Sequence, residues 1–179
     1  FRDNPEQFIA RVGRLIVQEK ANMVVDHICY DRIEGGYDSS IFTKGGNNRD
    51  EAEGYQASKC VQDWVFPDGR IESDFAKDLD NAAEVAVYAK LPRGFQIPTP
   101  VGNYAPDWAV AFRDDSGLKH LFFVAETKGS LESFDLRGIE NSKIACAKRL
   151  FNQLDLADGT RYEQATTYQT LLDEVKALQ

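Results

Sequence analysis

Hydrophobic residues along this chain alternate between helical and extended spacing. Over residues 5–20, Phe8, Ile9, Val12, Leu15 and Ile16 recur at helical spacing, and Pro5 suits a first helical turn. This stretch is therefore predicted to be an amphipathic helix. Similar spacing predicts further helices over 72–82, 139–152 and 171–178, and a weaker helical signal covers 50–62.

Runs rich in β-branched and aromatic residues separate these helices. They predict strands at 23–33, 64–70 (running into a turn), 84–91, 104–112, 121–130 and 162–168. Proline and glycine interrupt residues 92–102. The connection between 112 and 121 is too short for a crossover helix, so the strands on either side of it are predicted to form an antiparallel hairpin.

This order of elements predicts an α/β fold with a mixed central sheet flanked by helices. A length of 179 residues favours one domain with a substantial core. We expect residues 1–60 to be an N-terminal elaboration and 64–170 to form the main core. No apolar run reaches the length of a membrane span, so we expect no membrane partner and a cytoplasmic location. The chain starts at Phe1 with Met23 as its one methionine, so we expect a fragment or a processed chain.

Charge and cysteine content narrow the function classes. A net charge of −8 argues against polyanion binding over the whole surface, although it leaves room for a local basic face. The 3 cysteines lie far apart and form no CxxC pair. A disulfide framework or a zinc site is therefore not expected, and a reducing compartment fits.

Ionisable residues lie inside the two apolar strands of the predicted hairpin. Asp107 begins the first strand, "YAPDWAVAF", and Glu126 and Lys128 lie in the second, "LFFVAETKGS". Alternation places Glu126 and Lys128 on one face, and pairing of the strands can bring Asp107 close to Glu126. Two neighbouring carboxylates repel each other and lose solvation, and a divalent cation relieves both costs.

This residue pattern suits Mg²⁺ or Mn²⁺, which prefer oxygen ligands. A lysine two residues after a metal-binding glutamate can hold an attacking water, as metal-assisted phosphodiester hydrolysis requires. The competing interpretation is that these charges are surface groups or salt bridges. Glu72, one turn before Phe75 and Ala76, can supply a third acid, or it can simply be a helix-start carboxylate stabilised by the helix dipole.

A longer pattern makes the hypothesis more specific. The segments "ESDFAKDLDN", "VYAKLPRGFQIPTPVGNYAPDWAVAF", "HLFFVAETKGS" and "LRGIENSKIACAKRLF" closely resemble the C-terminal endonuclease domain of type III restriction enzyme Res subunits. That domain belongs to the PD-(D/E)xK nuclease superfamily. The resemblance covers residues 72–152 specifically and extends more loosely to the preceding part of the chain. It implies a restriction-endonuclease-like fold and a Mg²⁺-dependent endonuclease that cuts DNA.

The resemblance also assigns roles to residues. It implies that Asp107 and Glu126 hold Mg²⁺ (with Mn²⁺ as a substitute), that the backbone carbonyl of Thr127 is an extra ligand, and that Lys128 positions the nucleophile. Glu72 matches the helix glutamate of the family and would bind the same ion or a second one. Asp74 is the neighbouring candidate for that position.

DNA contacts are expected where positive charge gathers. Residues 136–151 carry four basic residues against one acidic residue, Glu140, and form the most basic segment of the chain. Lys143, Ser142 and Lys148 are the candidate phosphate contacts, although each also fits an ordinary solvated helix face. Arg93 and Tyr104 are weaker candidates. His27 and His120 lie outside every motif described here.

The resemblance further implies that a separate methyltransferase (Mod) subunit reads the recognition site and that an upstream helicase region uses ATP. This chain carries no GxxxxGK[ST] phosphate loop and would be the cutting module alone. Two alternatives remain: a repair or resolvase-type nuclease of the same superfamily, and a non-catalytic DNA-binding or subunit-docking module.

Overall fold

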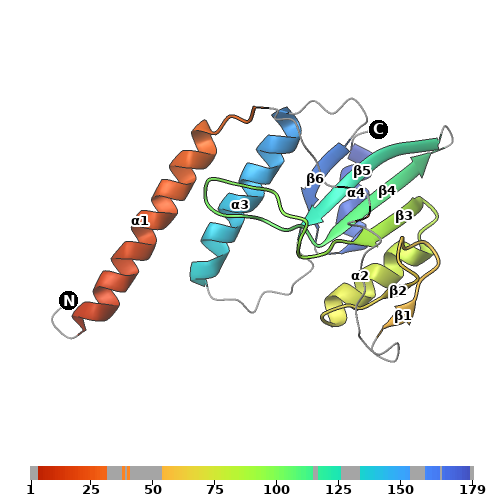
Figure 1. Cartoon of the computed structure of the whole chain (residues 1–179), viewed down its shortest axis with the longest axis horizontal. Coiled ribbons are helices and arrows are strands. Elements are labelled where there is room, and N and C mark those ends of the chain that lie inside the picture. Colours follow the sequence, from red (N-terminus) through yellow and green to blue (C-terminus); the bar gives the residue numbers. More distant parts are fainter. Residues whose placement is uncertain are drawn as a thin grey trace.

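The computed structural model (Figure 1) describes residues 4–31, 38, 40, 54–114, 117–125, 134–153, 160–165 and 167–177. Its elements are α1 (Pro5–His27), β1 (Tyr55–Gln56), β2 (Trp64–Val65), α2 (Arg70–Asn81), β3 (Val85–Lys90), β4 (Trp108–Asp114), β5 (Gly117–Ala125), α3 (Phe134–Gln153), β6 (Thr160–Gln164) and α4 (Tyr168–Ala177). The order of helices and strands confirms a mixed α/β architecture.

The central sheet has four strands in the order β3-β4-β5-β6. β3, β4 and β5 are antiparallel neighbours, which confirms the predicted hairpin between β4 and β5. β6 returns parallel to β5 after the long helix α3. The sheet is therefore mixed, because a helical crossover joins its last two strands.

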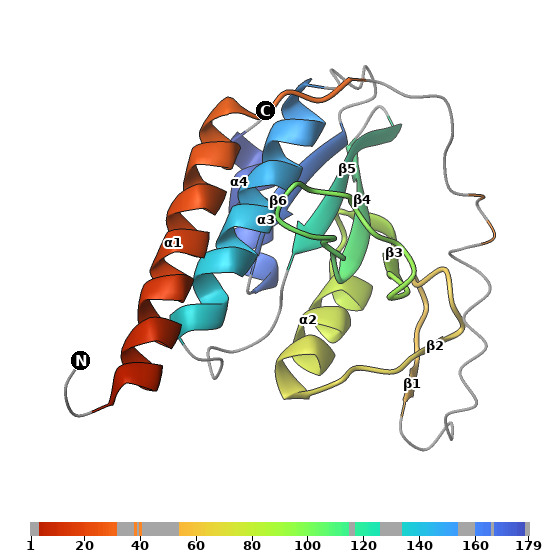
Figure 2. The same ribbon diagram turned by 60° about the vertical axis from the view of Figure 1, so that its left-hand side comes forward.

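Each face of the sheet carries its own apolar core. On one face, Trp108, Val110 and Phe112 of β4 pack with residues of α2 and α4. On the other face, Ala109 packs in a cluster that includes Ala147 of α3. Figure 2 shows α3 on one side of the sheet and α2 on the other. This alternation along β4 follows from the two-residue period of a strand.

A two-stranded hairpin of β1 and β2 lies beside β3, the outer strand of the central sheet. Backbone hydrogen bonds join Tyr88 of β3 to Lys59 (3.0 Å) and to Val61 (2.8 Å). The carboxylate of Asp80, near the end of α2, accepts hydrogen bonds from the Ser58 amide at 2.9 Å and the Lys59 amide at 2.8 Å. The residues that follow β1 are therefore fixed to α2 as well as to the sheet.

Helix α1 lies alongside α3, outside the sheet layers (Figures 1 and 2). Asn4 caps the helix, because its side chain accepts a hydrogen bond from the Gln7 amide at 2.9 Å, and Pro5 follows the cap. Ala21 is the one buried residue of this helix. The helix predicted over 5–20 is confirmed, and it extends to His27.

Two sequence predictions about secondary structure are wrong within the described residues. The strand predicted at 23–33 is helical through His27, because the contact of α1 with α3 outweighs the strand preference of Val24 and Val25. The helix predicted at 50–62 is absent over 54–62, which contains β1, several bends and an isolated bridge at Cys60. Pairing with β2 and the contacts of Asp80 fix the backbone there. Residues 50–53 and 32–33 of these predictions lie outside the described residues.

The strand predicted at 64–70 is a strand only over Trp64–Val65, and residues 126–130 of the strand predicted at 121–130 lie outside the described residues. The other helices and strands lie close to their predicted positions. The helix predicted at 72–82 begins two residues earlier, at Arg70. The helix predicted at 139–152 corresponds to α3, the helix at 171–178 to α4 and the strand at 162–168 to β6. No helix in the described part of the chain is long and apolar enough to cross a membrane. The division into residues 1–60 and 64–170 stays a prediction.

Candidate active site

Asp107 lies where β3 ends and β4 begins. Lys90, the last residue of β3, pairs with Trp108, the first residue of β4. One residue further along, the Leu91 amide donates a hydrogen bond to the backbone carbonyl of Asp107 at 2.8 Å. Asp107 is partly buried. Its backbone is therefore held at the end of the sheet where β3 stops, one residue before β4 begins.

The end of β5 lies beside the start of β4. Trp108 pairs with Val124, and β5 ends at Ala125. The next residues in the sequence are Glu126, Thr127 and Lys128, which lie outside the described residues. Since Trp108 directly follows Asp107, the end of β5 lies beside the chain at Asp107. The roles predicted for Glu126, Thr127 and Lys128 stay predictions.

Glu72, in the first turn of α2, contacts the end of β3. Its side chain is only 5% exposed. The Oε2 atom accepts a hydrogen bond from the Asp68 amide at 2.8 Å and another from Lys90 Nζ at 2.7 Å. The first of these bonds reaches back to Asp68, the residue before the N-cap Gly69, and the carboxylate itself lies in the first turn, where the helix dipole favours negative charge. Glu72 thus has a structural role whether or not it binds a metal.

Asp74, the other candidate on α2, points elsewhere. Its side chain is 61% exposed and forms an ion pair with Arg70, with Arg70 Nε 3.7 Å from the carboxylate. An exposed pair of this kind contributes little to stability. Of the two acids, Glu72 is the one that the structure places against the sheet.

Lys90 is a residue of this region that the sequence analysis did not single out. Its ammonium contacts Glu72, the Phe66 carbonyl at 3.0 Å and the Asp68 carboxylate at 3.4 Å. It also lies 5.9 Å from the centroid of the Trp108 ring. The sequence does carry a signal for Lys90: a charged residue ends the apolar strand "VAVYAK", and the charged residue Asp107 directly precedes the next strand.

A second group of polar side chains lies on the α3 side of the same edge. Tyr162 is buried, and its ring stands edge-on to that of Tyr104, with centroids 5.8 Å apart. Burial raises the pKa of Tyr162, and its tyrosine neighbour and the carboxylates of Glu140 and Asp107 raise that pKa further. The tyrosine hydroxyl therefore stays protonated. Both Glu140 of α3 and Asp107 therefore lie within electrostatic range of Tyr162.

The candidate DNA contacts of α3 are already engaged within the chain. Lys143 lies 3.6 Å from a carboxylate oxygen of Glu140, and Lys148 donates to Glu163 at 2.7 Å. Ser142 is buried and accepts a hydrogen bond from Gln18 of α1 at 3.4 Å. Ser142 lies against α1, so a phosphate could reach it only if that helix moved away.

The weaker candidates occupy different settings. Tyr104 is buried and exchanges two backbone hydrogen bonds with Ile97, at 2.6 and 2.9 Å, so it serves the core. Arg93 is exposed. His27 is an exposed residue at the end of α1, and His120 pairs with Phe112 in the central hairpin.

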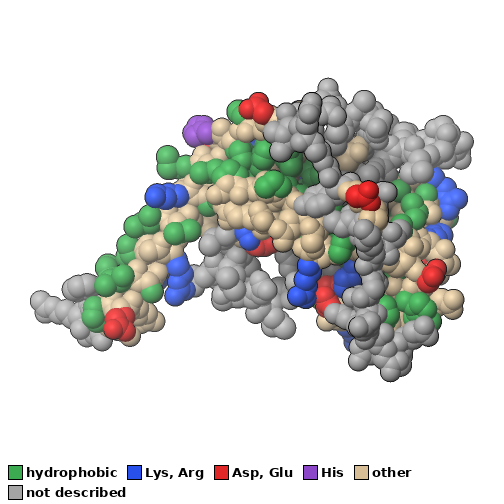
Figure 3. Space-filling view, in the orientation of Figure 1, with side chains coloured by type: hydrophobic (Ala, Val, Ile, Leu, Met, Phe, Trp, Pro, Cys, Tyr) green, Lys and Arg blue, Asp and Glu red, His purple; other side chains and the backbone are tan. Residues whose placement is uncertain are grey.

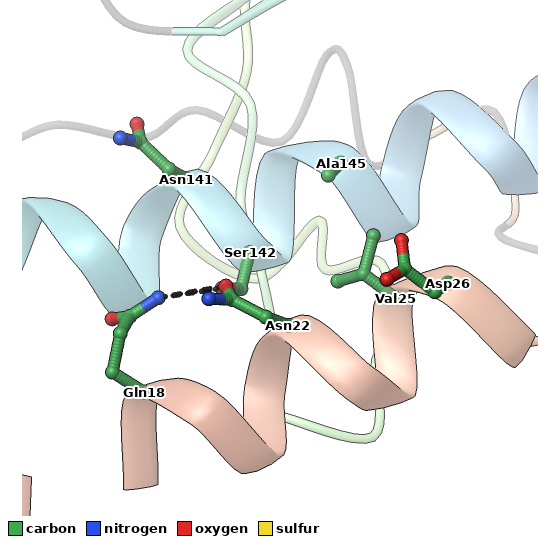
Figure 4. A pocket seen from close by; sticks show the side chains of 7 residues that line it. All are labelled: Gln18, Asn22, Val25, Asp26, Asn141, Ser142 and Ala145. Carbon is green, nitrogen blue, oxygen red and sulfur yellow. Dashed lines mark hydrogen bonds between the residues drawn. The ribbon is translucent and has the colours of Figure 1, made fainter. Parts of the chain in front are cut away.

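A polar hollow of about 330 Å³ separates α1 from α3 (Figure 4). Three amide side chains, of Gln18, Asn22 and Asn141, line it together with Val25, Asp26, Ser142 and Ala145. Gln18 bridges it by donating to Asn22 at 3.0 Å and to Ser142. The hollow is part of a polar contact between two helices, and it lies on α3 rather than at the sheet edge that carries Asp107.

Among the described residues, no group of three or more histidines, cysteines or acids lies together in a way that could hold a metal ion. Glu72 and Asp107 are carboxylates, the donor type that Mg²⁺ prefers. Glu72 contacts the last residue of β3, and Asp107 directly precedes the first residue of β4. The donors present fit a hard cation in kind. The remaining ligands expected from the sequence, Glu126 and the Thr127 carbonyl, lie outside the described residues.

Comparison with known proteins places these observations in a family. Residues 58–170 match the family described as "Endonuclease domain". The match begins beside β1 and ends within α4, so it contains the whole central sheet together with α2 and α3. No curated protein and no solved structure matches the chain.

Proposed function

Since this chain belongs to the endonuclease-domain family, we propose that it is a Mg²⁺-dependent nuclease module that hydrolyses phosphodiester bonds in double-stranded DNA. The observation that carries the proposal is the meeting of three segments at one edge of the sheet. Asp107 directly precedes β4, beside the end of β3, where Lys90 binds Glu72. β5 ends at the same place, directly before Glu126 and Lys128 in the sequence.

In this proposal, Asp107 and Glu126 hold the metal, the Thr127 carbonyl adds a ligand, and Glu72 completes the acidic set. When bound, Mg²⁺ supplies charge neutralisation at the phosphate and lowers the pKa of a coordinated water. Lys128 orients the attacking water and stabilises negative charge that develops on the phosphate. Lys143 contacts the DNA backbone, and its ion pair with Glu140 yields to the phosphate.

We further propose that the module belongs to a type III restriction enzyme Res subunit. The support is the run of residues from 90 to 108, which is much longer than the three-residue nuclease signature. The methyltransferase subunit and the ATP-dependent helicase region would then be its partners. A repair or resolvase-type nuclease is the alternative within the superfamily, and dependence of DNA cleavage on those two partners separates the two.

The first test measures Mn²⁺ binding by calorimetry together with cleavage of plasmid DNA. Asp107→Ala is expected to abolish both, because one carboxylate ligand is lost. Asp74→Ala is the matched control: it removes an exposed acid of α2 and is expected to leave both unchanged. A wild-type chain that binds no Mn²⁺, with or without DNA, would instead favour the non-catalytic docking module.

A further inference from the structure

Two consecutive residues, Lys90 and Leu91, contact both described acids of the proposed site. Lys90 Nζ donates to the Glu72 carboxylate at 2.7 Å, and the Leu91 amide donates to the Asp107 carbonyl at 2.8 Å. We propose that Lys90 is a positioning residue that fixes the Glu72 carboxylate at the end of β3 and so sets the contribution of Glu72 to metal binding. This inference rests on the proposed function.

The contacts of the ammonium show what holds it. A lysine ammonium has three N–H donors, and Lys90 meets three acceptors: Glu72 at 2.7 Å, the Phe66 carbonyl at 3.0 Å and Asp68 at 3.4 Å. The face of the Trp108 ring lies within range of a favourable cation–π contact. Lys90 is therefore engaged by protein groups from the loop before α2, from α2 and from β4, and it acts through Glu72 rather than on DNA.

These contacts also restrain the orientation of Glu72. Lys90 and the Asp68 amide both bind Oε2, so the carboxylate cannot rotate without losing two hydrogen bonds. Partners that orient a metal ligand in this way typically change metal affinity by about 10-fold to 100-fold. A cation that merely sat near the ligands would have the opposite effect, because its removal would strengthen metal binding. The sign of the change therefore distinguishes positioning from simple repulsion.

The experiment titrates Mn²⁺ into the whole chain by calorimetry, alone and with a phosphorothioate DNA duplex that resists cleavage. Lys90→Gln is expected to weaken Mn²⁺ binding by about 10-fold or more. In a Glu72→Gln background the same substitution is expected to change the affinity less than about 2-fold, because the residue acts through Glu72. That loss of coupling is a result that general destabilisation would not produce.

Lys59→Gln is the matched control. The Lys59 ammonium donates to the Ala82 carbonyl at the opposite end of α2, so it also ties this helix to its surroundings. Its loss is expected to lower the urea midpoint of unfolding and to leave Mn²⁺ affinity unchanged. If Lys90→Gln does not fold, Lys90→Arg keeps the charge but replaces the compact ammonium with a planar fork, and Mn²⁺ binding is then expected to weaken several-fold.

Equal or tighter Mn²⁺ binding by the folded Lys90 variant overturns the inference. If Asp107→Ala abolishes binding while Lys90→Gln does not change it, only the positioning role fails and the proposed function stands. If the wild-type chain binds no Mn²⁺ under either condition, both fail together.

Discussion

Glu72 illustrates how one residue can serve both the fold and the site. Its carboxylate accepts the Asp68 amide at the start of α2 and is also the counter-ion of Lys90. The sequence of α2 is compatible with two interpretations of Glu72, a helix-start carboxylate and a metal ligand. The hydrogen bond to Asp68 supports the first, and the position beside β3 is compatible with the second, so the two do not exclude each other.

Asp80 has a structural role, because the contacts described for its carboxylate join α2 to residues 58 and 59. Burial by itself would raise the pKa of its carboxyl group. Hydrogen bonds from the Lys59 amide, from the Ser58 amide and hydroxyl, and from Tyr88 outweigh that effect and hold the pKa below its usual range. The ionised form is therefore favoured in the folded protein, where it fixes residues 58 and 59 to α2.

The lowered pKa of Asp80 predicts a pH-dependent contribution to stability. Since the folded pKa is below the unfolded value of about 3.9, this contribution is fully present above that value and is lost as pH falls through the folded pKa. Asp80→Asn should therefore lose stability at pH 6 but depend less on pH between 6 and 3 than the wild type. Urea unfolding at several pH values measures this, and parallel pH profiles for the two proteins would contradict it.

At the scale of elements, α1 presents its apolar residues to solvent rather than to the core. Phe8, Ile9, Leu15, Ile16 and Met23 are all exposed, and Figure 3 shows hydrophobic side chains along this helix. The contact with α3 is instead made through Ala21 and through polar groups such as Gln18. The spacing of apolar residues predicted the helix correctly, but it did not indicate the side on which α1 packs.

The two sides of α1 should respond differently to substitution. Ile9→Glu and Ile16→Glu place a charge on the exposed side and are expected to change the free energy of unfolding by less than about 0.5 kcal/mol. Ala21→Leu adds volume where α1 meets α3 and is expected to cost about 1–3 kcal/mol. Urea denaturation of the three variants checks this. A large loss for either isoleucine variant would show that the exposed side is covered in solution.

At the scale of the whole molecule, the charge distribution limits how the chain can hold DNA. The net charge is −8, and both Lys143 and Lys148 already lie beside carboxylates. Lys148 has the closer partner, with its ammonium 2.7 Å from Glu163, whereas Lys143 lies 3.6 Å from Glu140. The longer ion pair makes Lys143 the candidate that exchanges its carboxylate for a phosphate, although its side chain is 22% exposed against 41% for Lys148.

Salt dependence of DNA binding tests this difference. Each phosphate contact contributes about −0.9 to the slope of log affinity against log salt concentration for duplex DNA. Lys143→Gln is expected to make the slope shallower by about 0.9, and Lys148→Gln by clearly less. Fluorescence anisotropy with a labelled duplex over a range of salt concentrations measures both slopes. Equal changes in the two variants would contradict the assignment of Lys143 as the DNA contact.

The sequence alone determined most elements and the family of this chain. Apolar periodicity predicted α2, α3 and α4, and the short connection between two apolar strands predicted the β4–β5 hairpin. These features depend on local spacing, which the order of residues carries directly. The resemblance to an endonuclease domain agrees with the family match over residues 58–170. The metal, the partners and the roles of Glu126 and Lys128 stay predictions.

Tertiary structure decided the features that depend on contacts between distant segments. Residues 23–27 are helical because α1 lies against α3, although their β-branched side chains favour a strand. Lys90 and Glu72 are 18 residues apart in the chain, and only the packing of β3 against α2 makes them partners. Ser142 is likewise buried because α1 packs against α3, which local spacing does not predict. Local spacing can predict an element and its apolar side, but the partner that covers each side is chosen by the folded chain as a whole.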